Sequence, residues 1–459
     1  MIAFPHPLKE QYHYSLFDKL TMDIEVKVIS RETIKPSYPT PGHLRHYSLS
    51  FLDRNAPQIF MPWVLFYPKD TNTELNNLEQ RERIKKSLSE ALTQFYPLAG
   101  RVKENLYIEC NDEGVNYVEA VAKCNLSEFL ENLNPCEHKK FLPYELDDVN
   151  DLVAAVQVTT FNCGGIVIGL ELSHKVADAS SFFLFLNSWA ATARGSSSIV
   201  SPRLDAATIF PPATLSGYNP NIGMSRNNIV LKRIVFDGNA IAAIRAKFSS
   251  SNKSIEYPRP TRVEALSAFI YSRFIAATQP EADPNKAYIM FIAVDLRKRL
   301  DPPLPQNCFG NISQSTASVV SNNIEDGFNG TVLPMREAIR TVNMDYVKKL
   351  DGHLNFITEN IEKSSRGEAV TFGFTSLCRF PIYEADFGWG KPVWVGSTKL
   401  LYHNLVTFFD TKSEDGIEAW ITLKEEDMGS NSCGTNFLCS QGFRFSRNSE
   451  RLHLATAST

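Results

Sequence analysis

Residues 201–228 constrain the fold more than any other segment, because they divide the chain into two parts. The segment combines several prolines with Ser, Asn and Gly residues, and it lacks a sustained apolar period. Each proline fixes its own φ angle and removes a backbone donor, so the segment does not continue a helix or a central strand. A chain of 459 residues is also too long for one ordinary hydrophobic core. We therefore expect a domain at residues 22–200, a crossover linker at 201–228 and a second domain at 229–428.

The first part alternates apolar strands with amphipathic helices. A helix is predicted at residues 78–95, because Ile84, Leu88 and Leu92 recur every four residues on one face. A second helix is expected after Asp178. Apolar runs predict strands at 26–34, 61–67, 153–158 and 166–172, and a hairpin formed by 106–110 and 115–120.

The second part has the same mixed character. Thr261 and Glu264 form a T-x-x-E capping box, which predicts the start of a helix. Apolar runs and turn residues predict a helix at 241–248, strands at 230–236 and 288–296, and a late hairpin formed by 401–409 and 417–423. Because strands and helices mix without a regular βαβ rhythm, we expect an α/β or α+β protein with mixed sheets.

The two ends of the chain differ from these domains. Residues 1–21 show no clear period and are expected to form a loose extension. Residues 429–459 are rich in Ser, Asn and Arg and carry no amphipathic stripe. Such a composition is poorly suited to a packed helix, so we expect a disordered tail.

Charge and composition narrow the class of protein. The net charge is −4 with acidic and basic residues interspersed, which argues against a nucleic-acid partner. The sequence contains no run of 18 apolar residues, so no membrane span is expected. Its start has no apolar core of signal-peptide length. The eight cysteines are scattered without a C-x-x-C pair, so a zinc site is not expected. We expect a monomeric protein in the cytoplasm with reduced thiols.

His174 and Asp178 form an H-x-x-x-D motif at the end of a predicted strand. Taken alone the motif is weak, because nine histidines give chance matches. Its position just past the strand at 166–172 and before a helix is one where a rigid scaffold presents side chains to a cleft. An imidazole there can take a proton from an alcohol or amine near neutral pH. A His/Asp pair can also bind a metal, but no further ligand lies at close spacing, so no metal is expected.

A second motif, D-F-G-W-G, occupies residues 386–390. Its two glycines and two aromatic residues are typical of a tight, buttressed turn. Asp386 suits a turn hydrogen bond or an ion pair, so the residues themselves favour a structural role.

Taken together, these two motifs resemble the hallmarks of the plant BAHD acyltransferases, and further strings agree with the alkaloid-type branch. The resemblance covers roughly residues 24–428 in the right order. The further strings are KPSYPTP (35–41), FYPLAGR (95–101), CNDEGV (110–115), FNCGG (161–165), LRKRLDPPLP (296–305), FGN (309–311) and DGIEAW (415–420).

The resemblance implies a fold and an activity. It implies an α/β protein with two chloramphenicol acetyltransferase-like domains, each a mixed β-sheet flanked by helices, and a channel between them. It implies that acyl-CoA, with acetyl-CoA preferred, is a co-substrate and that no cofactor is bound permanently. The expected reaction is O- or N-acylation of a small-molecule acceptor, such as an alkaloid hydroxyl, with His174 as the general base.

The resemblance also assigns the other site residues. Asp178 is expected to pair with Arg297 and to orient the His174 loop, while Asp386 supports the domain interface and the CoA channel, although it is often regarded as catalytic. Thr375 is the candidate donor to the oxyanion, and the candidate CoA contacts are Lys253 and Arg262.

Two departures from the family pattern keep an alternative open. Leu377 stands where many relatives have a tryptophan, and Asp295, where asparagine is usual, could compete for Arg297. Leu377 and the unusual tail leave a catalytically impaired, ligand-binding relative as the second hypothesis. A serine hydrolase is a third, but the chain has no G-x-S-x-G motif.

Overall fold

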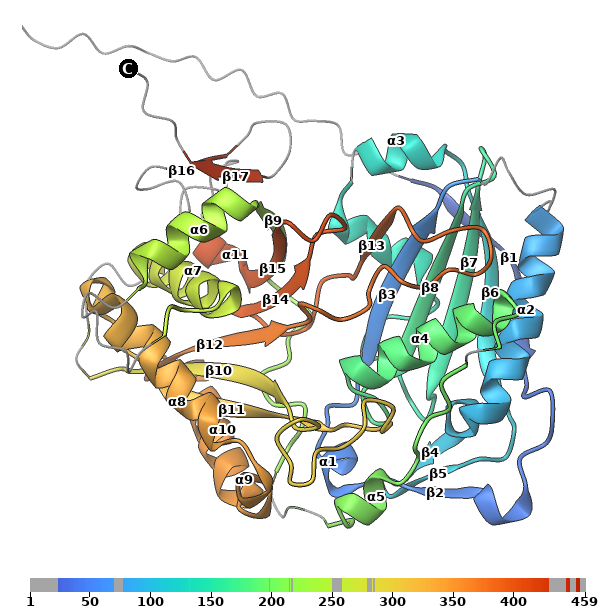
Figure 1. Ribbon diagram of the computed structural model, residues 1–459, viewed down its shortest axis with the longest axis horizontal. Coiled ribbons are helices and arrows are strands. Elements are labelled where there is room, and N and C mark those ends of the chain that lie inside the picture. The colour runs from blue at the N-terminus through green and yellow to red at the C-terminus, as the bar shows by residue number, and fades with distance from the viewer. Residues whose placement is uncertain are drawn as a thin grey trace, which may run out of the picture.

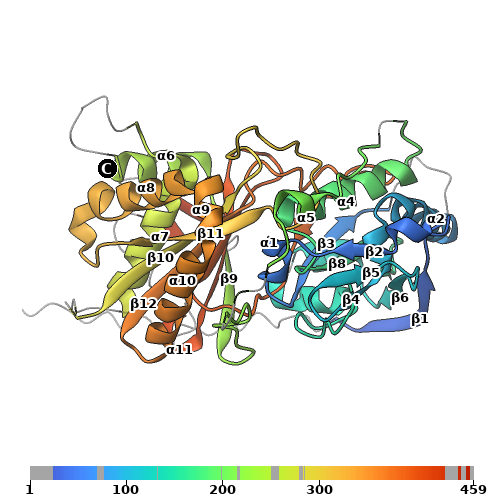
Figure 2. The ribbon, with the colours of Figure 1, turned by 90° about the horizontal axis from the view of Figure 1, so that it is seen from below.

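The computed structural model describes residues 24–428 apart from 70–76, 132, 198, 214, 216–217, 250–257, 279–282 and 284, together with 443–445 and 451–454. Two domains, each built on a mixed β-sheet with flanking helices, lie side by side (Figures 1 and 2). The predicted α/β class with two such domains is confirmed. The extension expected at residues 1–21 lies outside the described residues.

The first domain is built on a sheet of six described strands, in the order β1-β6-β7-β8-β3-β13. Neighbouring strands are antiparallel except β6 and β7, which are parallel. Helices α2 (Asn77–Gln94) and α4 (Ala179–Ala193) lie along this sheet, and their apolar residues share one core with the strands. The strands are β1 (Val26–Ile34), β3 (Phe60–Tyr67), β6 (Val115–Ala122), β7 (Ala154–Phe161), β8 (Ile166–Ser173) and β13 (Trp394–Gly396).

The predicted hairpin at residues 106–120 is wrong, although both of its segments are strands. β5 (Tyr107–Glu109) pairs with β2 (His46–Ser48) and β4 (Arg101–Lys103) in a separate three-stranded sheet, whereas β6 belongs to the large sheet. The connecting turn is bound elsewhere, because the Asp112 carboxylate accepts hydrogen bonds from the backbone N–H and the hydroxyl of Thr40, at 2.9 and 2.6 Å. The turn with Asp112 therefore connects the three-stranded sheet to the six-stranded sheet.

The second domain is built on a sheet of eight described strands, in the order β11-β10-β12-β14-β15-β9-β17-β16. The predicted hairpin of β14 and β15 is confirmed, with Leu405 opposite Thr422. The capping box is also present, with Thr261 N 2.8 Å from the Glu264 carboxylate and Glu264 N 3.1 Å from the Thr261 hydroxyl. The first six strands by sequence are β9 (Ile229–Phe236), β10 (Ala287–Asp295), β11 (Ser313–Val319), β12 (Ala369–Ser376), β14 (Leu405–Asp410) and β15 (Ile417–Lys424).

Helices flank this second sheet, as Figure 2 shows. The main ones are α6 (Gly238–Lys247), α7 (Arg262–Thr278), α8 (Leu333–Thr341), α9 (Met344–Lys348) and α10 (Leu350–Ser365). The two domains also contain further short helical pieces. These are α1 (Phe51–Arg54), α3 (Leu126–Glu131), α5 (Ala206–Ile209), α11 (Glu425–Met428), η1 (Gly42–Leu44), η2 (Tyr96–Ala99), η3 (Pro135–Phe141), η4 (Ile324–Asp326) and η5 (Phe328–Val332). In its described residues, the predicted crossover 201–228 is mostly irregular and contains only α5.

A segment of the second half returns to the first domain, which the expected boundaries did not anticipate. β13 pairs antiparallel with β3, with Trp394 opposite Phe66 and Gly396 opposite Val64 (Figure 1). Before it, buried Phe387 packs edge-on against Trp189 of α4 at 5.0 Å between ring centroids. The aromatic side chains of the D-F-G-W-G motif are therefore buried by the first domain, not by the second.

The expectation of a disordered tail is wrong for seven residues. β16 (Phe443–Phe445) and β17 (Arg451–Leu454) pair with each other, and β17 continues the second sheet beside β9, with Leu452 opposite Phe236. The sequence alternates apolar and polar residues there, a pattern typical of strands. The other residues of 429–459 lie outside the described part of the chain.

Candidate active site

The backbone of the H-x-x-x-D motif is fixed at both ends. His174 directly follows β8, and its N–H donates to the carbonyl of Ile59 at 2.8 Å. Asp178 caps α4, because its Oδ1 accepts from the N–H of Ser181 at 2.9 Å. The motif therefore spans a turn between a buried strand and a capped helix, as its position in the sequence predicted.

The imidazole of His174 lies at the contact between the two domains. Its Nδ1 is 2.9 Å from the Oδ1 of Asn311, which precedes β11 of the second domain. Burial lowers the pKa of His174 below its usual 6.5, although the hydrogen bond of Asn311 and the charge of Asp178 oppose this shift. A neutral imidazole at neutral pH is the form that a general base requires.

Asn311 is itself held by a buried carboxylate. The side-chain nitrogen of Asn311 lies 2.9 Å from Asp53 Oδ1 and 2.7 Å from the carbonyl of His174, and its backbone N–H donates to the same Asp53 oxygen at 2.8 Å. Asp53 belongs to α1, where its Oδ2 accepts from the N–H and the hydroxyl of Ser50 at 2.9 and 2.6 Å.

The sequence interpretation assigned no role to Asn311 or to Asp53. The F-G-N string at 309–311 carried a signal for Asn311, but only as part of the family resemblance. Asp53 carried a local signal as the third residue of a Ser50 capping box. That pattern predicts a helix start and says nothing of a partner in the other domain.

Asp178 forms a bidentate ion pair with Arg297. Arg297 Nη1 and Nη2 lie 2.7 and 3.1 Å from the two carboxylate oxygens. Burial by itself would raise the pKa of Asp178, but the guanidinium charge and its hydrogen bonds outweigh it and hold the pKa below the usual value. Asp178 also accepts from the N–H of Ile312 at 3.0 Å, so its carboxylate is directed toward the second domain.

Asp295 does not displace Asp178 from Arg297, as the sequence had suggested it could. Arg297 Nη1 also reaches Asp295 Oδ1 at 3.2 Å, and the carbonyl of Cys308 accepts from Nε and Nη2 at 3.2 and 2.9 Å. The guanidinium is fully buried and serves both carboxylates at once.

Asp386 acts within its own turn. Its Oδ1 accepts from the N–H groups of Gly388 and Gly390 at 2.8 and 2.9 Å, and both glycines have positive φ angles, 103° and 98°. On the other side Arg194, the C-cap residue of α4, donates to the carbonyl of Asp386 at 2.8 Å. The carboxylate therefore fixes the turn and makes no hydrogen bond to His174.

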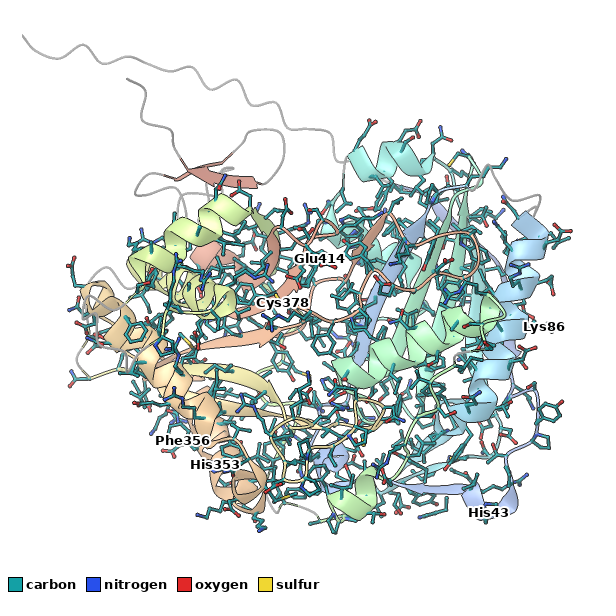
Figure 3. The ribbon with its side chains drawn as sticks, in the orientation of Figure 1. His43, Lys86, His353, Phe356, Cys378 and Glu414 are labelled. Atoms are coloured by element: carbon teal, nitrogen blue, oxygen red, sulfur yellow. The ribbon has the colours of Figure 1, made fainter. Side chains whose placement is uncertain are left out.

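A groove of about 500 Å³ runs along α4, between the two domains. Cys378 lies on its lining, and Figure 3 places this residue between the two domains. Lys298 and Arg379 bring two exposed cations to the same groove. Its remaining lining residues are Ser180, Phe183, Leu184, Asn187, Ser188, Ala191, Val200, Asp295, Gln306, Phe380 and Pro381.

Two of the other predicted site residues, Arg262 and Thr375, belong to the described part of the chain. Arg262 donates to Asp410 at 2.8 Å, and Asp410 in turn accepts from the N–H of Arg379 at 2.6 Å, so Arg262 supports one wall of the groove. Thr375 lies on β12, makes no hydrogen bond to His174 and is partly exposed. Lys253 lies outside the described residues.

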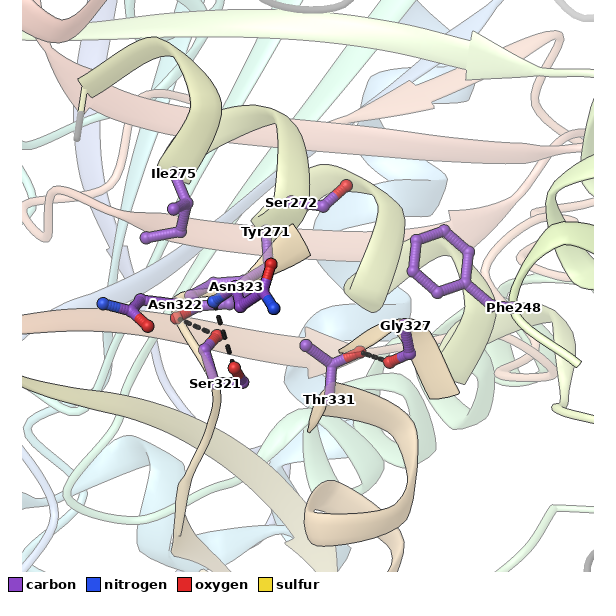
Figure 4. A pocket seen from close by; sticks show the side chains of 9 residues that line it. All are labelled: Phe248, Tyr271, Ser272, Ile275, Ser321, Asn322, Asn323, Gly327 and Thr331. Carbon is purple, nitrogen blue, oxygen red and sulfur yellow. Dashed lines mark hydrogen bonds between the residues drawn. The ribbon is translucent and has the colours of Figure 1, made fainter. Parts of the chain in front are cut away.

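A hollow in the second domain, between α7 and η5, has room for about 10 Å³, which is no more than one water molecule (Figure 4). No group of three or more His, Cys, Asp or Glu side chains among the described residues could hold a metal ion. None of the helices described there is long and apolar enough to cross a membrane.

Comparison with known proteins identifies the family. The Transferase family matches residues 24–432. The chain belongs to the BAHD acyltransferases of this family. As a BAHD member it is an acyl-CoA-dependent acyltransferase.

Several BAHD relatives match the chain over most of its length. Stemmadenine O-acetyltransferase from Catharanthus roseus is 37% identical over 411 residues, vinorine synthase from Rauvolfia serpentina 35% over 412, and a limonoid 21-O-acetyltransferase from Melia azedarach 36% over 416. Each comparison covers 88% of this chain and 95% of the relative.

Solved structures agree on the fold. The crystal structure of vinorine synthase matches with a TM-score of 0.77 and 34% identity, covering 88% of this chain and 96% of that one. TRI101 from F. sporotrichioides, solved with coenzyme A and T-2, matches with a TM-score of 0.67 over 83% of this chain and 96% of that one. At 17% identity this second likeness shows the fold alone.

Proposed function

We propose that this BAHD member transfers an acetyl group from acetyl-CoA to a hydroxyl of a plant specialised metabolite, with His174 as the general base. The observation that carries this proposal is the buried imidazole of His174, which Asn311 holds between the domains at the end of a buried strand and whose pKa burial lowers. Relatives that are named O-acetyltransferases support the acetyl donor and the oxygen acceptor.

The proposed reaction needs no covalent enzyme intermediate. The acceptor hydroxyl gives its proton to Nε2 of His174 while its oxygen attacks the thioester carbonyl carbon. The resulting tetrahedral oxyanion collapses, the carbon–sulfur bond breaks, and the CoA thiolate takes the proton from the imidazolium. The products are an acetyl ester and free CoA. Orientation of the two substrates and proton transfer supply the acceleration, the base being worth about 10²–10⁴-fold.

The remaining residues take supporting roles in this proposal. Asp178 and Arg297 hold the turn that carries His174, and Asp386 fixes the turn that closes one end of the domain interface. Thr375 is proposed as an oxyanion donor, since its hydroxyl has no hydrogen bond among the described residues.

The groove beside α4 is the proposed route for CoA. It lies between the domains, and exposed Lys298 and Arg379 on its lining suit the phosphates of the co-substrate. Arg262 supports this wall through Asp410. Charge reversal by Lys298→Glu or Arg379→Glu should raise the KM for acetyl-CoA several-fold and leave the KM for the acceptor unchanged. An equal rise in both KM values would argue against this route.

The acceptor class is wider than the alkaloids that the sequence suggested. Relatives named for limonoid acetylation are as similar to this chain as those named for alkaloid acetylation, at 34–37% identity. We therefore propose a hydroxylated polycyclic metabolite of either class as the acceptor.

A screen tests the proposed function directly. The purified protein is incubated with a panel of acyl-CoAs and pooled alkaloid and limonoid alcohols, and products are detected by mass. A mass gain of one acetyl group on an acceptor, with release of free CoA, is expected. Binding of acceptors without transfer, and without slow hydrolysis of acetyl-CoA, would instead support the catalytically impaired, ligand-binding relative.

A further inference from the structure

We infer that Asp53 is a positioning residue that sets the tautomer of His174 through the side-chain amide of Asn311. The inference rests on the proposed role of His174 as the base, and it adds a residue from a different segment of the chain. Asp53 belongs to α1, is not part of the groove lining, and makes its hydrogen bonds to Ser50 and Asn311 and not to His174. It acts only through its hydrogen bonds to Asn311.

The orientation of the Asn311 amide is fixed by the groups around it. The amide atom that lies 2.9 Å from Asp53 Oδ1 also lies 2.7 Å from the carbonyl oxygen of His174. Asp53 Oδ1 already accepts the backbone N–H of Asn311 at 2.8 Å, and a carbonyl oxygen can only accept. An atom that faces two acceptors must be the donor, so it is the NH₂ group.

This orientation determines which nitrogen of His174 carries the proton. With its NH₂ turned to Asp53, Asn311 presents its oxygen to the Nδ1 of His174 at 2.9 Å. An amide oxygen only accepts, so Nδ1 must donate and therefore carries the hydrogen of the neutral ring. The lone pair is then on Nε2, the nitrogen that the proposed mechanism uses.

Asp53 is suited to hold this arrangement because it cannot turn. It is fully buried, and its second oxygen accepts from the N–H and the hydroxyl of Ser50, so both oxygens are engaged. Without the carboxylate, the carbonyl of His174 alone would oppose a flip of the amide. A flipped amide would present NH₂ to Nδ1, stabilise the opposite tautomer and place the proton on Nε2, where it blocks the base.

A kinetic cycle tests the inference. Asp53→Ala, Asn311→Leu and the double variant should each lower kcat by a similar factor, about 10- to 100-fold, as part of what a general base contributes. The KM values of both substrates should stay within about twofold, because neither residue is placed in the binding groove. Asp237→Ala is the control, since Asp237 also stabilises the start of a helix, by accepting from Ala240 N of α6 at 2.7 Å, much as Asp53 accepts from Ser50 at the start of α1.

The double variant distinguishes the results that support the inference from those that contradict it. If Asp53 acts through Asn311, its removal costs nothing more once Asn311 is leucine. If the two losses multiply, or if Asp53→Ala keeps the wild-type kcat, the inference is wrong. A fall in kcat for Asp237→Ala as large as that for Asp53→Ala would assign the effect to lost stability and would also overturn it.

The tautomer itself can be observed by NMR with ¹⁵N-labelled histidine, using His174→Ala to assign the signal. In the wild type, Nδ1 of His174 should be protonated, and Asp53→Ala should transfer much of that proton to Nε2. An unchanged tautomer would overturn the inference. Should the alanine variant not fold, Asp53→Asn serves instead. Ser50 and Asn311 donate to different oxygens of Asp53, and an asparagine has an oxygen at only one of these two positions. If His174→Ala stays active while the tautomer shifts as expected, the proposed function fails and this inference stands.

Discussion

The carboxylate of Asp178 and the guanidinium of Arg297 form a two-point contact that is fully withdrawn from solvent. Asp178 is the N-cap of α4 in the first domain, and Arg297 lies two residues beyond the end of β10 in the second. The pair therefore joins the turn that carries His174 to the opposite domain.

Loss of one partner of this pair should be strongly destabilising. Asp178→Ala leaves the buried guanidinium of Arg297 with Asp295, the Ser181 hydroxyl and backbone carbonyls, and should cost about 3–5 kcal/mol of unfolding free energy. A double-mutant cycle with Arg297→Met, followed by urea unfolding, should give clearly non-additive losses. The exposed pair of Arg366 and Glu368, 2.9 Å apart, is the control and should show almost no coupling. Additive losses for Asp178 and Arg297 would reject their pairing.

His174→Ala should lower turnover by about 10²–10⁴-fold while the fold survives, because the substitution removes only the base. Steady-state rates at saturating acetyl-CoA, together with a thermal melt, measure both effects. A variant that keeps more than half of the wild-type turnover would show that His174 isn't the base.

The pH dependence of kcat/KM should reflect the lowered pKa of His174. The base acts when unprotonated, so the rate rises with pH through its pKa and then levels off. Because burial lowers that pKa below 6.5, the plateau should already be reached near neutral pH. A profile from pH 4.5 to 9 checks this, and an acid limb centred above pH 7 would contradict it.

Asp386→Ala should act as a structural lesion. The substitution leaves the N–H groups of Gly388 and Gly390 without their acceptor, which should cost about 1–3 kcal/mol and weaken acetyl-CoA binding through the altered interface. Asp386→Asn keeps one oxygen at this position and should recover most of the stability. A well-folded Asp386→Ala variant with a normal KM for acetyl-CoA but no turnover would instead place Asp386 in the chemistry.

Stability should fall in acid because of His138, a fully buried histidine on η3. Its Nδ1 lies 2.6 Å from the carbonyl of Ser397, and its Nε2 has no partner among the described residues. Burial lowers its pKa to about 3, below that of the unfolded chain, so the folded state resists protonation. The free energy of unfolding therefore has its full value above about pH 6.5. It decreases as the pH falls toward 3, by up to about 1.4 kcal/mol per pH unit. The free energy of unfolding, measured with urea between pH 7 and 4.5, should depend less on pH in His138→Gln than in the wild type. His46→Gln, on the exposed surface of β2, should show the wild-type dependence on pH.

The local order of elements could be predicted because it depends on neighbouring residues. The strand before His174, the helix after Asp178 and the Thr261 capping box each follow from a pattern within a few residues. The choice of partners could not be predicted this way. The strands at β5 and β6 were located, but a local pattern does not tell which of several strands each will join.

The site was predicted only in part for the same reason. His174 was recognisable from its motif, and Arg297 became recognisable through the family resemblance. Asn311 and Asp53 are 258 positions apart in sequence and meet only when the two domains are assembled. A single buried polar residue has no periodicity, so the sequence holds no local signal for such a contact.

The return of β13 to the first sheet makes the two halves unsuitable for exchange at the crossover. An N-terminal fragment that ended near residue 200 would lack the strand beside β3 and the aromatic side chains of Phe387 and Trp389 that the first domain buries. A chimera between two relatives would therefore need to take residues 377–400 from the same parent as its N-terminal half. The same constraint acts on recombination between such genes, so this distant segment should be inherited together with the first domain whose surface it completes.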